Sequence, residues 1–160
     1  MKTFIVLCLV SAVLLPASVV LGQEKTKVVA AWKVAITRSD TIIISETEKH
    51  TLALAQYKIL SETVNEGTPF GDFAEGTINA VEDFIKGTGT SQGYNVLRYG
   101  DTILLAKWSG EVKASASGVT TSEGTWVLTG GPFEGGGTYT GKFTSPDDVV
   151  IEWKGEYNKK

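Results

Sequence analysis

The stretch Val149-Val150-Ile151-Glu152-Trp153-Lys154-Gly155-Glu156-Tyr157 alternates large apolar and charged residues. Val149, Ile151, Trp153 and Tyr157 fall on one face, and the charged residues between Ile151 and Tyr157 fall on the other. This period of two is typical of a β-strand with one buried face. The end of the chain is therefore predicted to be a half-buried strand.

The same alternation occurs elsewhere along the chain. We expect further strands over residues 28–36, 41–44, 103–113, 125–129 and 137–144. Residues 50–64 also fit one side of a helix, and we expect them to form a strand. Turn signals separate these pieces at Ser39-Asp40, Gly67-Thr68-Pro69, Gly87 to Gly93, Gly100-Asp101, Gly130-Gly131-Pro132 and Ser145-Pro146-Asp147-Asp148.

Glycine spacing supports an all-β fold. Of the 18 glycines, 17 lie from Gly67 onward, a few residues apart. Trp108-Ser109-Gly110-Glu111 and Trp153-Lys154-Gly155-Glu156 share a Trp-x-Gly-Glu motif, in which glycine makes room beside an indole and permits the bends of a small barrel. We expect a small closed antiparallel barrel of about eight strands, because closure leaves no exposed edge.

The first 22 residues are typical of an export signal. Lys2 precedes an apolar run from Phe4 to Leu15, and Val20-Leu21-Gly22 suits cleavage. The sequence therefore predicts a signal peptide over residues 1–22 and a single domain over residues 23–160, secreted or periplasmic. Cys8 lies too early to carry the lipid of a lipoprotein, and no long apolar run follows that would span a membrane after cleavage.

Composition excludes several classes of site. Cys8 is the only cysteine and His50 the only histidine, so disulfide scaffolds, cysteine nucleophiles and Cys/His zinc sites are excluded, and we expect no metal and no cofactor. The net charge is −3, and −4 without Lys2, which disfavours nucleic-acid binding. Residues 136–142 have the spacing of a phosphate-binding loop, but Phe143 occupies the position where a Ser or Thr hydroxyl would bind magnesium. A nucleotide site is therefore not expected there.

Five residues are candidates for a ligand-binding site. Trp32, Trp108 and Trp126 lie on predicted strands and either line a cavity or pack in the core. His50 is either a general base or a solvated histidine at a strand end. Tyr94 either offers a hydroxyl to a ligand or packs at a glycine corner. No nucleophile-elbow motif supports a Ser-His-Asp triad.

The run Gly124–Tyr139 resembles the Thr-Gly-Gly-x-Gly-x-Phe-x-Gly segment of allene oxide cyclases and, more loosely, the Gly-Thr-Gly-x-Phe turn of dirigent proteins. Further segments similar to uncharacterised exported relatives of this barrel are His50 before an apolar strand, Gly87-x-Gly89 leading to Gly93-Tyr94, Gly100-Asp101 before Trp108-x-Gly110, and Glu152-Trp153-x-Gly155-Glu156-Tyr157. The resemblance covers most of residues 28–157. Pro132 directly after Gly131 shortens the family's turn.

The resemblance implies an eight-stranded antiparallel barrel of the allene oxide cyclase or calycin type, whose members often form homo-oligomers. Family enzymes cyclise a strained fatty-acid epoxide by confining it in an apolar cavity. No catalytic residue of the family can be matched here. We therefore expect an exported barrel that binds a small hydrophobic ligand such as a lipid, with a confining cyclase or isomerase and a solid structural barrel as the alternatives.

Overall fold

The computed structural model describes residues 24–160 except 116 and 146. The predicted signal peptide lies outside the described residues. The described chain forms eight strands: β1 (Thr26–Ser45), β2 (His50–Gly67), β3 (Phe73–Ile85), β4 (Thr88–Tyr99), β5 (Thr102–Ala114), β6 (Thr120–Gly130), β7 (Phe133–Ser145) and β8 (Asp148–Lys159).

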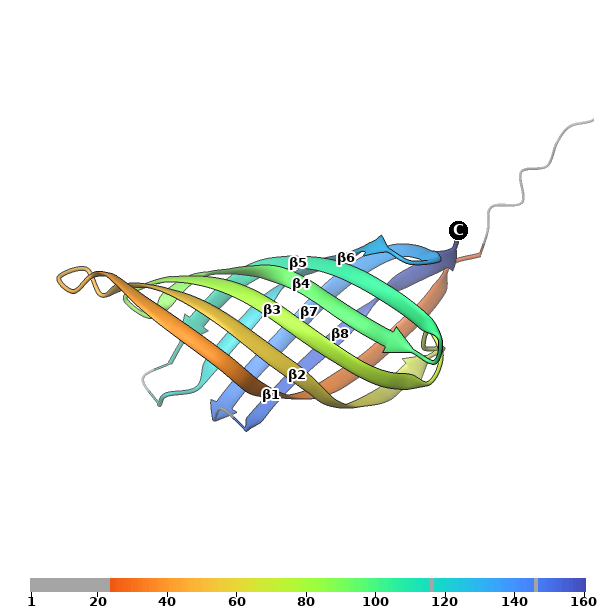
Figure 1. The fold of residues 1–160 in the computed structure, drawn as a ribbon, viewed down its shortest axis with the longest axis horizontal. Coiled ribbons are helices and arrows are strands. Elements are labelled where there is room, and N and C mark those ends of the chain that lie inside the picture. The colour runs from red at the N-terminus through yellow and green to blue at the C-terminus, as the bar shows by residue number, and fades with distance from the viewer. Residues whose placement is uncertain (1–23, 116, 146) are drawn as a thin grey trace, which may run out of the picture.

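The eight strands close into one antiparallel barrel in sequence order (Figure 1). Closure comes from β1 and β8, which pair from Thr26 opposite Tyr157 to Val34 opposite Val149. The all-β class and the closed eight-stranded barrel are thus confirmed. Residues 50–64, which also fitted a helix, belong to strand β2.

Two predicted turns are wrong. Ser39-Asp40 lies inside β1, which runs unbroken from Thr26 to Ser45 apart from bulges, one of them between Ile36 and Arg38. Residues 88–93 belong to β4, and only Lys86 and Gly87 separate β3 from β4. Gly89 and Gly93 are strand residues, and glycine is needed there because a Cβ at either position would meet a backbone oxygen of β3.

Two strands, β3 and β4, were not among the predicted ones. Their inward positions include Glu82 on β3 and Ser91 and Asn95 on β4, and the last two are buried. Polar residues at inward positions break the apolar–polar alternation by which strands are recognised. The same polar residues contribute to the barrel interior described below.

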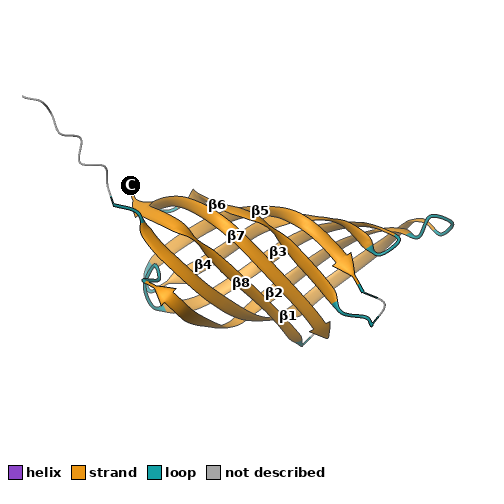
Figure 2. Ribbon diagram, turned by 180° about the vertical axis from the view of Figure 1, so that it is seen from behind, coloured by secondary structure: helices purple, strands orange, loops and turns teal. Residues whose placement is uncertain are grey.

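One end of the barrel is filled by a loop. The segment Thr68–Asp72 joins β2 to β3 and places Phe70 against Tyr157, with ring centroids 4.2 Å apart, and parallel to Trp153 at 6.0 Å. The hydroxyl of Tyr157 donates to the carbonyl oxygens of Thr68 and Pro69, at 3.1 Å each. We call the segment Thr68–Asp72 the plug. It lies at the same end as the C terminus (Figure 2).

Candidate functional site

The barrel encloses a cavity between the plug and the opposite end. Its volume is about 50 Å³, as space open to the centre of a water-sized sphere. A single water needs about 10–15 Å³ by this measure, so the cavity could hold roughly three to five waters. The lining residues are Trp32, Tyr57, Phe70, Ile78, Glu82, Ser91, Asn95, Leu97, Ala106, Trp108, Ser122, Trp126, Leu128, Tyr139, Phe143, Ile151 and Trp153.

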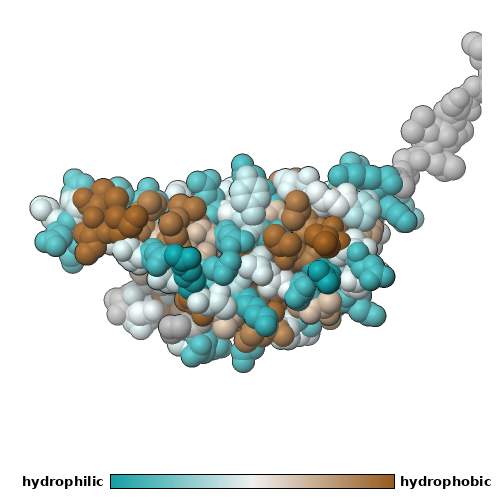
Figure 3. Space-filling view, in the orientation of Figure 1, coloured by the Kyte–Doolittle hydropathy of each residue, from teal (hydrophilic) through white to brown (hydrophobic). Residues whose placement is uncertain are grey.

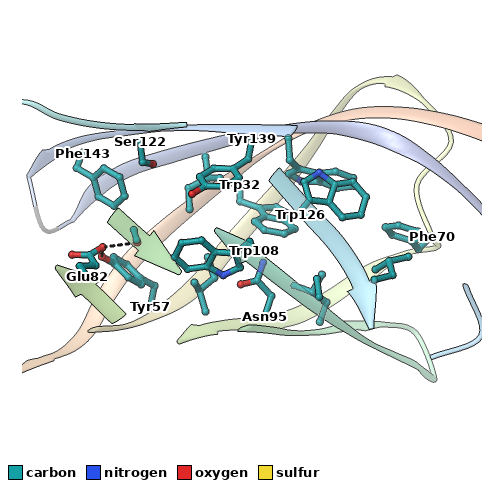
Figure 4. Close-up of a pocket in the computed structure, with 17 residues that line it drawn as sticks. Trp32, Tyr57, Phe70, Glu82, Asn95, Trp108, Ser122, Trp126, Tyr139 and Phe143 are labelled. Atoms are coloured by element: carbon teal, nitrogen blue, oxygen red, sulfur yellow. Dashed lines mark hydrogen bonds between the residues drawn. The ribbon is translucent and has the colours of Figure 1, made fainter. Parts of the chain in front are cut away.

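The lining changes character along the cavity (Figure 4). Phe70 of the plug lies at one end, and the indoles of Trp32, Trp108 and Trp126 lie in the middle. Glu82 and Tyr57 lie toward the other end, together with Ser122 and Phe143. The cavity therefore has an aromatic middle and one end that carries a carboxylate and hydroxyl groups.

Three of the five predicted ligand-binding residues line this cavity: Trp32 on β1, Trp108 on β5 and Trp126 on β6. Trp153 on β8 is a fourth lining indole. Glycines on neighbouring strands make the room. A Cβ at Gly93 would lie 2.8 Å from Cζ2 of Trp108, closer than side-chain carbons approach one another.

The other two predicted residues lie outside the cavity. Tyr94 is on the outer face of β4 and is 54% exposed. His50 begins β2 at the rim, and its Nε2 lies 2.7 Å from Oδ1 of Asp83. The structure therefore brings together the three tryptophans of the predicted set and separates His50 and Tyr94 from them.

Glu82 is the carboxylate of the cavity. It comes from β3, and its Oε1 accepts hydrogen bonds from Tyr57 at 3.2 Å and Ser91 at 3.5 Å. Burial raises the pKa of Glu82, and the two hydrogen bonds only partly counter it. Burial and then the charge of Glu82 raise the pKa of Tyr139 to about 12, which indicates that Tyr139 shares this end of the cavity.

Glu62 on β2 is a second interior carboxylate, and it holds a residue of the cavity lining in position. Its Oε1 accepts hydrogen bonds from Nε1 of Trp32 at 2.7 Å and from the hydroxyl of Tyr99 at 2.6 Å. Burial raises the pKa of Glu62, against the opposing effect of these hydrogen bonds. Glu62 does not line the cavity but fixes the orientation of Trp32, which does.

Four buried polar atoms of the described residues have no hydrogen-bond partner in the protein. They are Oδ1 of Asn95, Nε1 of Trp108, the hydroxyl oxygen of Tyr139 and Nε1 of Trp153. All four belong to residues that line the cavity. Buried polar atoms are nearly always bonded, and each unsatisfied one costs about 1–3 kcal/mol. Their concentration around one cavity indicates a place for polar atoms of a guest molecule or of water.

Sequence reasoning missed the polar part of this site. Tyr57, Glu82, Ser91 and Asn95 were not predicted to belong to it. One signal could have found two of them: in the run Ser91–Tyr99 every second residue, starting with Ser91, faces inward. The predicted turn over Gly87 to Gly93 concealed this register.

No protein-family model and no curated protein matches this sequence. The resemblance to allene oxide cyclases and dirigent proteins therefore stays a prediction. Among the residues that the structure describes, no three His, Cys, Asp or Glu side chains gather where they could hold a metal ion. The described part of the chain also contains no helix long and apolar enough to span a membrane.

Proposed function

We propose that this protein is an exported barrel that binds a small, mainly apolar ligand with a polar end. The observation that carries this proposal is the cavity, four of whose lining residues hold a buried polar atom without a partner in the protein. A ligand that bonds to them would gain hydrogen bonds which the protein alone leaves unmade. Ligand sites are commonly apolar cavities with a few fixed polar groups.

The chemistry of the lining defines the ligand. The indole N–H groups of Trp108 and Trp153 require acceptors, whereas Asn95 Oδ1 requires a donor. The aromatic middle favours a flat, apolar body. A cavity of about 50 Å³ is about a third of the roughly 150 Å³ cavity known to bind benzene, so a one-ring molecule fits only if lining side chains shift, and an entire fatty acid does not fit. A long chain would have to displace a lining side chain, and Phe70 in the plug is the candidate.

The test is native mass spectrometry of the protein from its producing cells, followed by solvent extraction and gas chromatography. A stoichiometric single-ring or short-chain compound with a hydroxyl or carbonyl group would support the proposal. A bare protein that also fails to bind any of a panel of phenols, cyclic ketones and short fatty acids would contradict it. That outcome would favour a solid structural barrel.

A second candidate function is a confining isomerase. It is favoured by the raised pKa of Glu82, because a buried carboxyl group keeps its proton to higher pH than one in water and can act as a general acid. Tyr57 donates to this carboxyl group and would hold it in place. In this account Glu82 would donate a proton to the ring oxygen as a C–O bond of the epoxide breaks, a hydride would shift to the resulting carbocation, and Glu82 would take the proton back from the protonated carbonyl group.

Styrene oxide is a suitable probe, because its epoxide rearranges to phenylacetaldehyde when the ring oxygen is protonated. Faster rearrangement by the wild type, lost in Glu82→Gln but kept in the exposed control Glu152→Gln, would support the isomerase. An unchanged background rate would reject this second candidate and leave the binding proposal standing.

A further inference from the structure

One edge of β1 is open at the end of the barrel opposite the plug. Pairing of β1 with β8 stops where Val34 lies opposite Val149. Pairing with β2 continues to Ser45, opposite His50. Over residues 35–45, β1 therefore has a neighbour on one side only among the described strands. Figures 1 and 2 show this part of β1 projecting with β2 beyond the rest of the barrel.

The projecting segment carries exposed apolar side chains. Ile42, Ile43 and Ile44 are 50%, 63% and 55% exposed, and Leu54 on the paired strand β2 is 45% exposed. Successive strand residues point to opposite faces, so three consecutive isoleucines place apolar surface on both faces. In Figure 3 this end of the molecule has a compact hydrophobic area.

The open edge lacks most of the features that keep strand edges apart. Residues 34–48 contain no proline, glycine or lysine. Within residues 35–45 the only charges belong to Arg38 and Asp40, which pair with each other at 2.7 Å and leave no net charge. Two irregularities in the pairing with β2, between Ile36 and Arg38 and between Ile43 and Ser45, lie near the two ends of this segment. A β-branched edge of low net charge is a template for pairing with another strand.

We propose that this edge pairs with the same edge of a second copy of the chain, antiparallel and around a two-fold axis at Ile42. Ile42 then lies opposite the partner's Ile42, and Thr41 lies opposite the partner's Ile43. Such an isologous contact uses the same surface twice and closes as a dimer. It covers the exposed isoleucines and joins the two barrels through one continuous sheet.

Charge complementarity supports this register. Centring on Ile42 brings Arg38 near the partner's Glu46, the first residue of the turn after β1, and the two-fold axis repeats this ion pair on the other side. Opposite charges that face one another across an interface help to fix its register. Arg38 and Glu46 lie at the two margins of the contact, so the ion pairs would flank an apolar centre.

Steric exclusion by β8 also favours this register over one centred on Ser39. A pairing centred on Ser39 would place Arg38 opposite the partner's Asp40, which is complementary in charge. It would also bring the partner's Ile44 opposite Val34, a position that Val149 of β8 already occupies. The hairpin turn after the partner's Ser45 would then run into the start of β8. The Ile42-centred register ends before this point.

The first test is sedimentation velocity at about 100 µM, a concentration that suits a small interface. We expect a dimer in the wild type and a monomer in Ile43→Lys, whose exposed position allows the variant to fold with an unchanged melting temperature. Val127→Lys on the outer face of β6, 48% exposed, is the matched control and should remain a dimer. A monomeric wild type, or a dimer that Ile43→Lys leaves intact, overturns the proposal.

The second test reads the register by disulfide cross-linking. In a Cys8→Ser background an added cysteine is the only thiol of the chain. Oxidation should give a covalent dimer with Ile42→Cys and at least tenfold less with Ser39→Cys, because Ser39 faces the partner's Ser45. Stronger cross-linking at position 39 would overturn the Ile42-centred register. Equal, weak cross-linking at both positions would place the contact elsewhere on the surface and overturn the edge pairing.

Discussion

The hydroxyl of Tyr57 donates a hydrogen bond to Oε1 of Glu82 across the adjacent strands β2 and β3, at 3.2 Å. This pair places an ionisable carboxyl group inside a barrel whose cavity is otherwise lined mainly by aromatic and aliphatic side chains. Burial raises the pKa of both groups, and the charge of Glu82 raises that of Tyr57 further. Burial therefore favours the protonated form of Glu82 compared with a glutamate in water, and the hydrogen bond from Tyr57 opposes this effect only in part.

The folding stability should depend on pH through the interior carboxyl groups. The pKa values of Glu62 and Glu82 are raised above the ordinary 4.5, so the folded state retains protons that the unfolded state has released. This contribution to stability is complete below pH 4.5 and is lost as the pH rises through the raised values. We expect Glu82→Gln to weaken this loss of stability above pH 4.5 in urea unfolding experiments.

The control for this pH dependence is Glu152→Gln, on the exposed outer face of β8. It should follow the wild-type profile. A Glu82→Gln profile that parallels the wild type over the entire range would show that Glu82 titrates as it does in water.

Removing the hydroxyl of Tyr99 should destabilise the fold through Glu62. Tyr99→Phe deletes a 2.6 Å hydrogen bond to a buried carboxyl group, which costs about 1.5–3 kcal/mol. Tyr94→Phe is the matched control, since Tyr94 is 54% exposed on the same strand, and should change the free energy of unfolding by less than about 0.5 kcal/mol. Equally small changes in unfolding free energy in both variants would mean that the hydrogen bond from Tyr99 to Glu62 contributes little to stability.

Substitutions of the cavity tryptophans should differ in their cost to stability according to whether the indole N–H is hydrogen-bonded within the protein. Nε1 of Trp126 donates to the carbonyl oxygen of Lys154 at 3.2 Å, whereas Nε1 of Trp108 has no partner. We therefore expect Trp126→Phe to cost about 1 kcal/mol more unfolding free energy than Trp108→Phe. In binding measurements the order should reverse, with Trp108→Phe weakening a ligand that carries an acceptor. Identical ligand affinity in both variants would show that the indole N–H of Trp108 does not bond to the ligand.

The plug should contribute to stability and limit access. Phe70→Ala removes a ring that contacts Tyr99, Phe133, Trp153 and Tyr157. Because Phe70 is only partly buried, we expect a loss of about 2–3 kcal/mol, below the usual range for a fully buried phenylalanine. The variant should also bind longer ligands, such as decanoate, that the wild type excludes. Exclusion of decanoate by both proteins would argue against access through the plug.

The barrel could be predicted from the sequence where strands follow a simple rule. Val149, Trp153 and Tyr157 are buried on β8, as the alternation in that strand requires. Trp108 and Gly110 likewise face the interior on β5, because the Trp-x-Gly spacing keeps them on one side. These elements obey a local pattern, and a local pattern can be read from one chain.

The polar end of the site could not be predicted in the same way. Glu82, Ser91 and Asn95 face inward at positions where a strand ordinarily carries apolar residues, so their strands were missed. Their shared location depends on pairing between strands, such as Ser91 opposite Glu82, which is a property of the closed sheet. The length of β1 was also missed, because Ser39-Asp40 has the composition of a turn but is held extended by β2.

The most direct test of ligand binding inside the barrel is a ¹⁹F NMR titration with 4-fluorophenol, which combines one ring with a hydroxyl group. We predict saturable binding to one site in the wild type and in the outer-face control Val127→Leu. Ala106→Leu, which fills the cavity from its wall, should bind at least tenfold more weakly while remaining folded by its melting curve. Binding that is absent in the wild type, or equally strong in Ala106→Leu, would contradict the account.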